Sequence, residues 1–213
     1  MRGKLELVEG VPISDVITRD WQQIKNFDAR PGDILIDTYP KSGTTWMQEI
    51  VDLILNNGDE AICRRGAIFE RVPFIELMCA MKPVLTSASH HSVTFSPSTQ
   101  VSQFTPSAQC HHHPLIPASS SPLHRSVIYV ARNARDTVTS FYHFEHMALI
   151  HPEPGTFEEY LERFMIGDVG WGSWYDHVKG FWEQKSQRNI LYLFYEDLKR
   201  VRNIKISFVS DRL

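Results

Sequence analysis

The sequence has few cysteines and no long apolar run. Its only cysteines are Cys63, Cys79 and Cys110, and their spacing shows no pairing that would suggest a disulfide framework. No stretch approaches the roughly 20 apolar residues that a membrane-spanning helix needs. The segment Met1–Gly10 also lacks the apolar core of a signal peptide. These absences predict a protein of a reducing, cytoplasmic compartment with no membrane partner.

The chain also lacks an excess of charge of either sign. Its 22 Lys and Arg residues are nearly balanced by 25 Asp and Glu residues, which gives a net charge of −3. Such a balance gives no reason to expect nucleic acid as a partner, although it allows a local basic pocket for one small anionic ligand. The length of 213 residues suits a single domain.

The middle of the chain, residues 83–124, contains no Lys, Arg, Asp, Glu or Gly. Ser, Thr, Pro, Gln and His dominate it, and six of the ten histidines lie there. Neither a helical nor a strand period persists through this composition, so we expect the segment to be aberrant and without regular structure.

On both sides of this segment, predicted strands alternate with predicted helices. The apolar runs favour buried strands, and the helices are indicated by apolar residues at helical spacing and by a capping box at Thr156–Glu159. This alternation predicts an α/β fold with a doubly wound, mostly parallel sheet. The predicted strands are 33–37, 127–131 and 190–195, and the predicted helices are 46–55, 136–147, one that begins at 156, and 173–185.

The loop between the first predicted strand and helix, Lys41–Thr45, is suited to binding an anion. A helix start exposes unpaired backbone N–H groups, Gly43 allows close backbone approach, and Lys41 adds a positive charge. Hydroxyl donors come from Ser42, Thr44 and Thr45. In the standard nucleotide P-loop the lysine follows the second glycine, whereas here it precedes the loop's only glycine. From spacing alone, a polar turn that binds no ligand remains open.

A wider set of motifs resembles the cytosolic sulfotransferases, in particular their phenol-type group. Residues 38–46 resemble the family's 5′-phosphosulfate loop, and residues 129–136 with 140–144 resemble its second nucleotide motif. The resemblance covers 6–78 and 127–199. Further matches lie at 29–36, 71–74, 151–156, 172–180 and 193–197.

This resemblance implies sulfuryl transfer from 3′-phosphoadenosine 5′-phosphosulfate (PAPS) to a hydroxyl or amine of a small acceptor such as a phenol, without a metal. Lys41 would be catalytic and would also contact the donor. Taken singly, each of the other matched residues could be an ordinary core or surface residue, and only their order along the chain favours the site. The implied donor-binding residues are Lys41, Ser42, Gly43, Thr44, Thr45, Trp46, Arg132, Ser140 and Tyr195, and the implied acceptor-pocket residues are Phe74 and Phe144.

The chain departs from the family's pattern at the catalytic base. The family carries a His in a Lys-Thr-His-Leu-Pro string, and no such string occurs here. The family's spacing from Arg132 leads to Cys110, so His111, the next residue, is the candidate replacement base. The neighbouring histidines do not have the spacing of a metal site.

The resemblance also stops after Lys199. We expect an incomplete sulfotransferase domain over 1–199 and an unrelated tail over 200–213. The family's Arg-Lys-Gly string for the 3′-phosphate and its dimer-forming segment are not found, so a family-type homodimer is not expected. A catalytically inactive truncated isoform that at most binds nucleotide remains an alternative, as does a kinase-like protein with Asp37 or Asp197 holding a metal.

Overall fold

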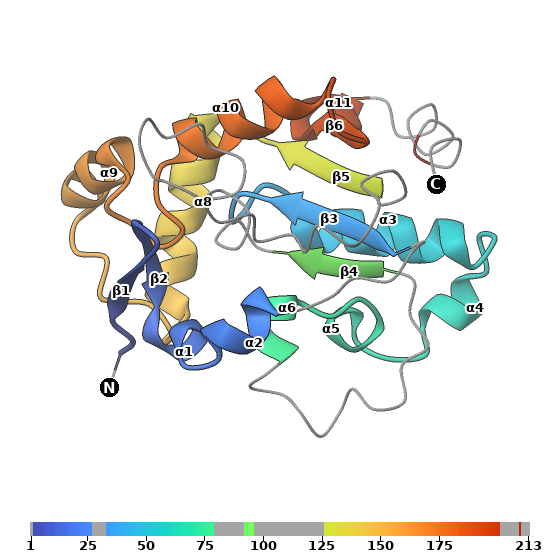
Figure 1. Ribbon diagram of the computed structural model, residues 1–213, viewed down its shortest axis with the longest axis horizontal. Helices are drawn as coiled ribbons and strands as arrows, with labels where there is room; N and C mark the ends of the chain where they lie inside the picture. The colour runs from blue at the N-terminus through green and yellow to red at the C-terminus, as the bar shows by residue number, and fades with distance from the viewer. Residues whose placement is uncertain (1, 27–32, 79–91, 96–125, 201–208, 210–213) are drawn as a thin grey trace.

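The computed structural model describes residues 2–26, 33–78, 92–95, 126–200 and 209 (Figure 1). Its centre is a parallel sheet of four strands in the order β4-β3-β5-β6. The strands are β3 (Ile34–Thr38), β4 (Ser92–Phe95), β5 (Ser126–Ala131) and β6 (Ile190–Phe194). The predicted parallel sheet is therefore confirmed.

The order of the strands fixes where a ligand can enter. Within this sheet, β3 comes first along the chain, β4 pairs with it on one side, and the chain then crosses over so that β5 pairs with β3 on the other side. In open α/β sheets, the crevice at the carboxyl ends of the two strands where the order reverses is the usual ligand site. Here those strands are β3 and β5, which pair from Ile34↔Ser126 to Thr38↔Val130.

One face of the sheet packs on helix α3 (Thr44–Leu55), which follows β3 directly. Alternate strand residues such as Ile36, Ile128 and Leu193 form a core cluster with Met47 and Val51 of this helix. Side chains in parallel strands alternate between faces, so the intervening residues must be covered on the other side.

The opposite face is covered in two parts. Leu35 packs against Ile13, Ile17 and Ile24, which come from the N-terminal hairpin and the short helices after it. Tyr129 stacks on Phe181 of α10 (Trp174–Gln184). Helices thus cover both faces, as a doubly wound fold requires. The N-terminal elements are β1 (Leu5–Val8), β2 (Val11–Ser14), α1 (Asp15–Thr18) and α2 (Trp21–Lys25).

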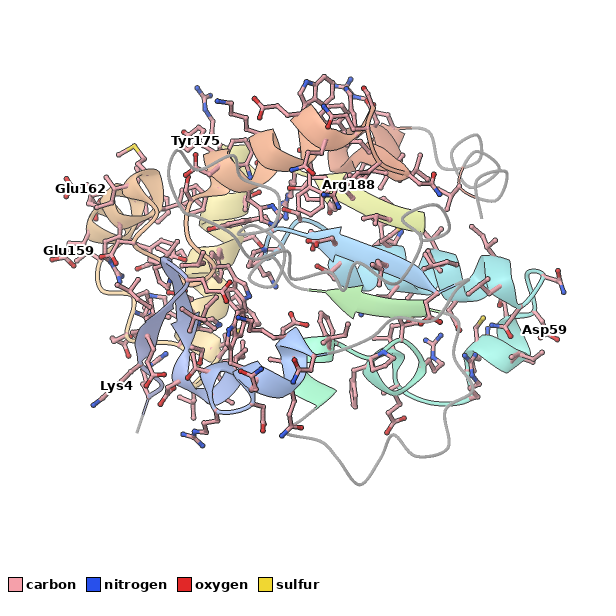
Figure 2. All side chains as sticks on the ribbon, in the orientation of Figure 1. Lys4, Asp59, Glu159, Glu162, Tyr175 and Arg188 are labelled. Carbon is pink, nitrogen blue, oxygen red and sulfur yellow. The ribbon has the colours of Figure 1, made fainter. Side chains whose placement is uncertain are left out.

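The remaining helices complete the domain. Helix α8 (Ala134–Met147) packs on α9 (Phe157–Ile166) through Phe141 and Phe164. The predicted capping box is confirmed, since Thr156 and Glu159 exchange backbone-to-side-chain hydrogen bonds of 3.0 and 3.3 Å. The side chains of Glu159 and Glu162 point outward from α9 (Figure 2). The other helices are α4 (Glu60–Cys63), α5 (Ile68–Arg71), α6 (Ile75–Met78) and α11 (Tyr195–Arg200).

The prediction that no regular structure occurs in residues 83–124 is wrong at one place. Ser92–Phe95 forms β4, which pairs in parallel with β3 from Ile34↔Ser92 to Asp37↔Phe95 (Figure 1). The β-branched and aromatic residues Val93, Thr94 and Phe95 have strand propensity, which the surrounding Ser- and Pro-rich composition concealed. The rest of 83–124 lies outside the described residues.

Several predicted boundaries also shift by one or two residues, and α8 begins at Ala134 instead of the predicted residue 136. Tyr195 begins α11 instead of ending β6, and α3 begins at Thr44, two residues earlier than predicted. Within the tail, Val209 is buried in the core cluster around α3, while 201–208 and 210–213 lie outside the described residues. The tail's relation to the family stays a prediction. None of the described helices combines the length and the apolar character needed to cross a bilayer.

Candidate functional site

The loop after β3 has a backbone shape suited to an anion. Lys41 and Gly43 both have left-handed φ, 65° and 104°, and the N–H of Ser42 donates to the carbonyl of Tyr39 at 3.1 Å. Gly43 then serves as the N-cap of α3 without any side-chain cap. Tight turns of this kind leave backbone N–H groups at a helix start, where the helix dipole favours negative charge.

The end of β5 supplies the second cation. Arg132 follows this strand and donates from Nη1 to the carbonyl oxygen of Lys41 at 2.7 Å, so the two predicted residues meet at the crevice between β3 and β5. The guanidinium lies 4.6 Å from the centre of the Tyr195 ring. Trp174 holds the same turn by donating to the Arg132 carbonyl at 3.2 Å. A guanidinium held by a carbonyl oxygen and an aromatic ring, on a turn that Trp174 fixes, is well placed to bind a phosphate.

These residues border a cavity of about 550 Å³. Lys41 lines it, with Nζ 4.5 Å from the centre of the Phe144 ring. Trp46 meets Tyr195 edge-on, with the ring centroids 5.5 Å apart. The cavity thus has a cationic part, where Arg132 meets Tyr195 and Trp46, and an aromatic part that includes Phe74 and Phe144. The predicted residues that line it are Lys41, Gly43, Thr44, Thr45, Trp46, Phe74, Arg132, Ser140, Phe144 and Tyr195.

Two predicted residues are placed differently. Ser42 is fully buried beneath the loop and is not among the described lining residues. Its contribution to an anion would therefore come through its backbone. His111, the candidate base, lies outside the described residues.

The electrostatics of the site favour an anionic ligand. Burial, followed by the charge of nearby Arg132, lowers the pKa of Lys41. The repulsion between these two cations is relieved when an anion binds between them, so the pair favours anion binding. Among the described residues, Nε of Arg132, which lines the cavity, is also buried without a hydrogen-bond partner, so the site holds a donor still available to a ligand. A phosphate-bearing ligand fits this arrangement.

A metal-assisted kinase site is disfavoured at Asp37. This carboxyl is 1% exposed, and burial, followed by the charge of Glu76, raises its pKa well above the usual range. A protonated carboxyl is a poor ligand for a hard cation. Asp197 lies in α11 and is not among the described lining residues. The described residues contain no cluster of metal-ligating side chains.

Several lining residues were not found by the sequence reasoning. Thr38 and Pro40 belong to the matched loop motif, so their sequence position could have identified them. Glu76 lies two residues after the predicted Phe74, so its position could also have identified it. The others, which only the tertiary fold brings to the cavity, are Ile17, Ile150 and Trp171.

Gly43→Ala should weaken the site. A methyl group there would lie 2.8 Å from Cδ2 of Tyr195, and the left-handed φ adds a backbone cost of about 1–2 kcal/mol. Gly58→Ala is the matched control, because Gly58 also has a left-handed φ of 79° but has nothing within 4 Å. We expect Gly43→Ala to lose more stability than Gly58→Ala in urea unfolding, because only its methyl group meets the Tyr195 ring, and only Gly43→Ala to lose affinity for a 3′,5′-bisphosphate nucleotide in calorimetry. Equal nucleotide affinity in the two variants would contradict this.

The buried pair of Glu145 and His151, whose imidazole packs against the Phe144 ring, should make the stability of the fold depend on pH. Oε1 of Glu145 lies 3.6 Å from Nδ1 of His151, and both side chains are almost fully buried. Burial raises the pKa of Glu145 to about 7 against the opposing effects of Arg163, Tyr160 and Arg2. Burial, followed by the charge of Arg2, lowers the pKa of His151 to about 4.

The two shifts act in opposite directions. The folded state holds the Glu145 proton more tightly than the unfolded state, so this group's contribution to stability falls as pH rises towards 7. His151 binds its proton less tightly when folded, so its contribution rises between about pH 4 and 6.5. Glu145→Gln should therefore gain stability relative to the parent between pH 5 and 8 in urea unfolding. A difference in unfolding free energy that is constant with pH would contradict the raised pKa.

Comparisons with known proteins agree with this fold. The family model described as the sulfotransferase domain matches residues 31–209. Sulfotransferase 1 family member D1 of Mus musculus is 50% identical over 93% of this chain and 64% of its own length. Human sulfotransferase 1C2 is 46% identical over 92% of this chain and 64% of its own length. The chain belongs to the sulfotransferase family.

The solved structures show the same fold. Mouse sulfotransferase SULT7A1 complexed with PAP superposes with a TM-score of 0.66 at 24% identity, covering 98% of this chain and 68% of that one. The present chain spans 64% of the length of the curated relatives above, somewhat less than two thirds.

Proposed function

We propose that this chain binds PAPS and transfers its sulfuryl group to the hydroxyl or amine of a small, phenol-like acceptor. The observation that carries the proposal is the meeting of Lys41 and Arg132 at the crevice between β3 and β5, beside an aromatic cavity. The named relatives are sulfotransferases, and a structural neighbour is a complex with PAP, which would be the product of the donor.

The cationic part of the cavity suits the donor. The loop 41–45 would hold the 5′-phosphosulfate through backbone N–H groups and hydroxyls, with Lys41 stabilising charge on the departing phosphate. Arg132 and Ser140 would bind the 3′-phosphate. Trp46 and Tyr195 would contact the adenine, because aromatic faces stack well on bases.

The aromatic part suits the acceptor. Phe74 and Phe144 would flank an apolar ring, and Phe144 already contacts Lys41. In the transfer, the acceptor oxygen or nitrogen forms a bond to sulfur while the bond between sulfur and the phosphate oxygen breaks. PAP leaves, and the acceptor proton passes to a base. We propose His111 as that base.

The test uses the whole chain, PAPS and 2-naphthol. We expect 2-naphthyl sulfate to form with PAPS and no phosphorylated product to form with ATP and Mg²⁺. A chain that binds neither PAPS nor PAP would contradict the proposal. PAP binding without any product would instead favour the alternative, an inactive isoform that at most binds nucleotide.

We also propose a cytoplasmic location, because the cysteines lack paired spacing. We further propose that the chain forms no family-type homodimer. Size-exclusion chromatography with light scattering tests the second point, and a stable dimer would contradict it.

A further inference from the structure

We propose that Arg71 is a positioning residue for the proposed acceptor side of the cavity. It would hold the segment that carries Phe74 against helix α3, whose first turn lines the cavity at the proposed donor site. This inference rests on the proposed function. It concerns a cluster of charged side chains formed by Glu49 and Asp52 of α3 with Arg65 and Arg71.

Every hydrogen-bonding nitrogen of Arg71 is engaged. The side chain is buried, and Nη2 lies 2.7 Å from both carboxylate oxygens of Glu49. Nη1 donates to Oδ2 of Asp52, and Nε donates to the carbonyl of Gly66 at 2.9 Å. A planar fork that meets two carboxylates and a carbonyl fixes both the position and the direction of the residue.

The partners of Arg71 lie on the same stripe of α3 as a cavity residue. Thr45, Gln48 and Asp52 are spaced by three and four residues, so they share one face of the helix. Thr45 lines the cavity, and Nε2 of Gln48 donates to the carbonyl of Val72 at 3.1 Å. The stripe therefore starts beside the proposed donor and ends at the residues that hold Arg71 and Val72.

The segment that follows Arg71 forms the proposed acceptor side of the cavity. Val72 is fully buried in the core cluster with Met47 and Val51, and Pro73 restricts the backbone after it. Phe74 and Glu76 then line the cavity. Phe74 lies only three residues after Arg71. A change in the position of the Arg71 backbone would therefore also move the Phe74 ring, which is part of the proposed acceptor site.

The two carboxylates of the cluster are matched by two guanidinium groups, and these hold Asp52 in its ionised form. Burial by itself would raise the pKa of Asp52, but hydrogen bonds from Arg65, Cys63 and Arg71 outweigh it and hold that pKa below its ordinary value. Arg65 approaches the two Asp52 oxygens at 2.6 and 3.1 Å. Asp52 thus keeps its ion pair with Arg65 when Arg71 is substituted, which limits the loss of stability that the substitution causes.

The test compares Arg71→Lys with Arg64→Lys. A lysine keeps the charge of Arg71 but cannot reach two carboxylates and a carbonyl at once. Arg64 is the matched control, since it makes one exposed ion pair with Glu60 on the neighbouring helix α4. Affinities for PAP alone, and for 2-naphthol in the presence of PAP, are measured by calorimetry on the whole chain.

We expect Arg71→Lys to lose about tenfold in 2-naphthol affinity while PAP affinity stays within about twofold. Arg64→Lys should change neither. Unchanged 2-naphthol affinity, or parallel losses for both ligands, would overturn the positioning role, because a general loss of structure moves both. If Arg71→Lys does not fold, Glu49→Gln makes the same comparison at a partly exposed partner, with a loss of about threefold expected for 2-naphthol only. A parent chain that binds no PAP would overturn the proposed function, and this inference with it.

Discussion

The 213-residue chain is expected to sulfate 2-naphthol about 10²–10⁴ times more slowly than mouse sulfotransferase 1 family member D1, because a positioned general base contributes a factor of that size. The family's Lys-Thr-His-Leu-Pro string is absent, and Cys110 stands at the position expected for the base. His111 is displaced by one residue, which would aim its imidazole differently. Initial rates at saturating PAPS, with equal concentrations of folded protein, measure the difference.

Nucleotide binding and sulfuryl transfer should be affected differently, because the donor site and the base are separate parts of the site. The cation pair of Lys41 and Arg132 is in place, so PAP should still bind even though transfer is slow. A rate close to that of the mouse relative would contradict the expectation of a displaced base. His111→Ala would then show whether that residue serves as the base.

Lys41→Ala should weaken the binding of PAPS by about 1.5–3 kcal/mol, or roughly 10- to 150-fold, since a hydrogen bond to a charged group contributes that much. The loss should be this large because Lys41 is partly buried beside Arg132, where solvent screens charge less than at the surface. Calorimetric titration of parent and variant with PAPS measures the change.

The control for this prediction is Lys179→Ala. Lys179 is an exposed residue of α10 with a single i,i+4 ion pair to Glu183 at 3.8 Å, far along the chain from the phosphate loop. It should leave PAPS affinity unchanged. If Lys41→Ala also left it unchanged, Lys41 would have no place in the donor site.

Local sequence signals were sufficient for most of the fold around the site. The apolar run 34–36, the glycine at 43 and the helical spacing after it each reflect short-range physics, so the strand, loop and helix could be predicted. The capping box at Thr156 is equally local. The placement of Lys41 and Arg132 together followed from one further rule, that parallel strands end at the same edge of a sheet.

Long-range features were not predictable in the same way. Strand β4 is four residues inside a Ser- and Pro-rich segment, and its pairing with β3 is a tertiary effect that composition does not reveal. The Arg71 cluster joins residues 19 and 22 positions apart, and nothing in the spacing of Glu49, Asp52 and Arg71 indicates that they meet. Ile17 and Ile150 reach the cavity from distant elements.

The central claim is that the crevice between β3 and β5 binds a nucleotide with phosphates at both the 3′ and 5′ positions. Calorimetric titration of the whole chain with PAP and with adenosine 5′-monophosphate tests it most directly, because the two ligands differ only in the 3′-phosphate. With Arg132 and Ser140 in their proposed roles, PAP should bind at least about tenfold more tightly. Equal affinity for the two nucleotides, or no binding of PAP, would contradict the account.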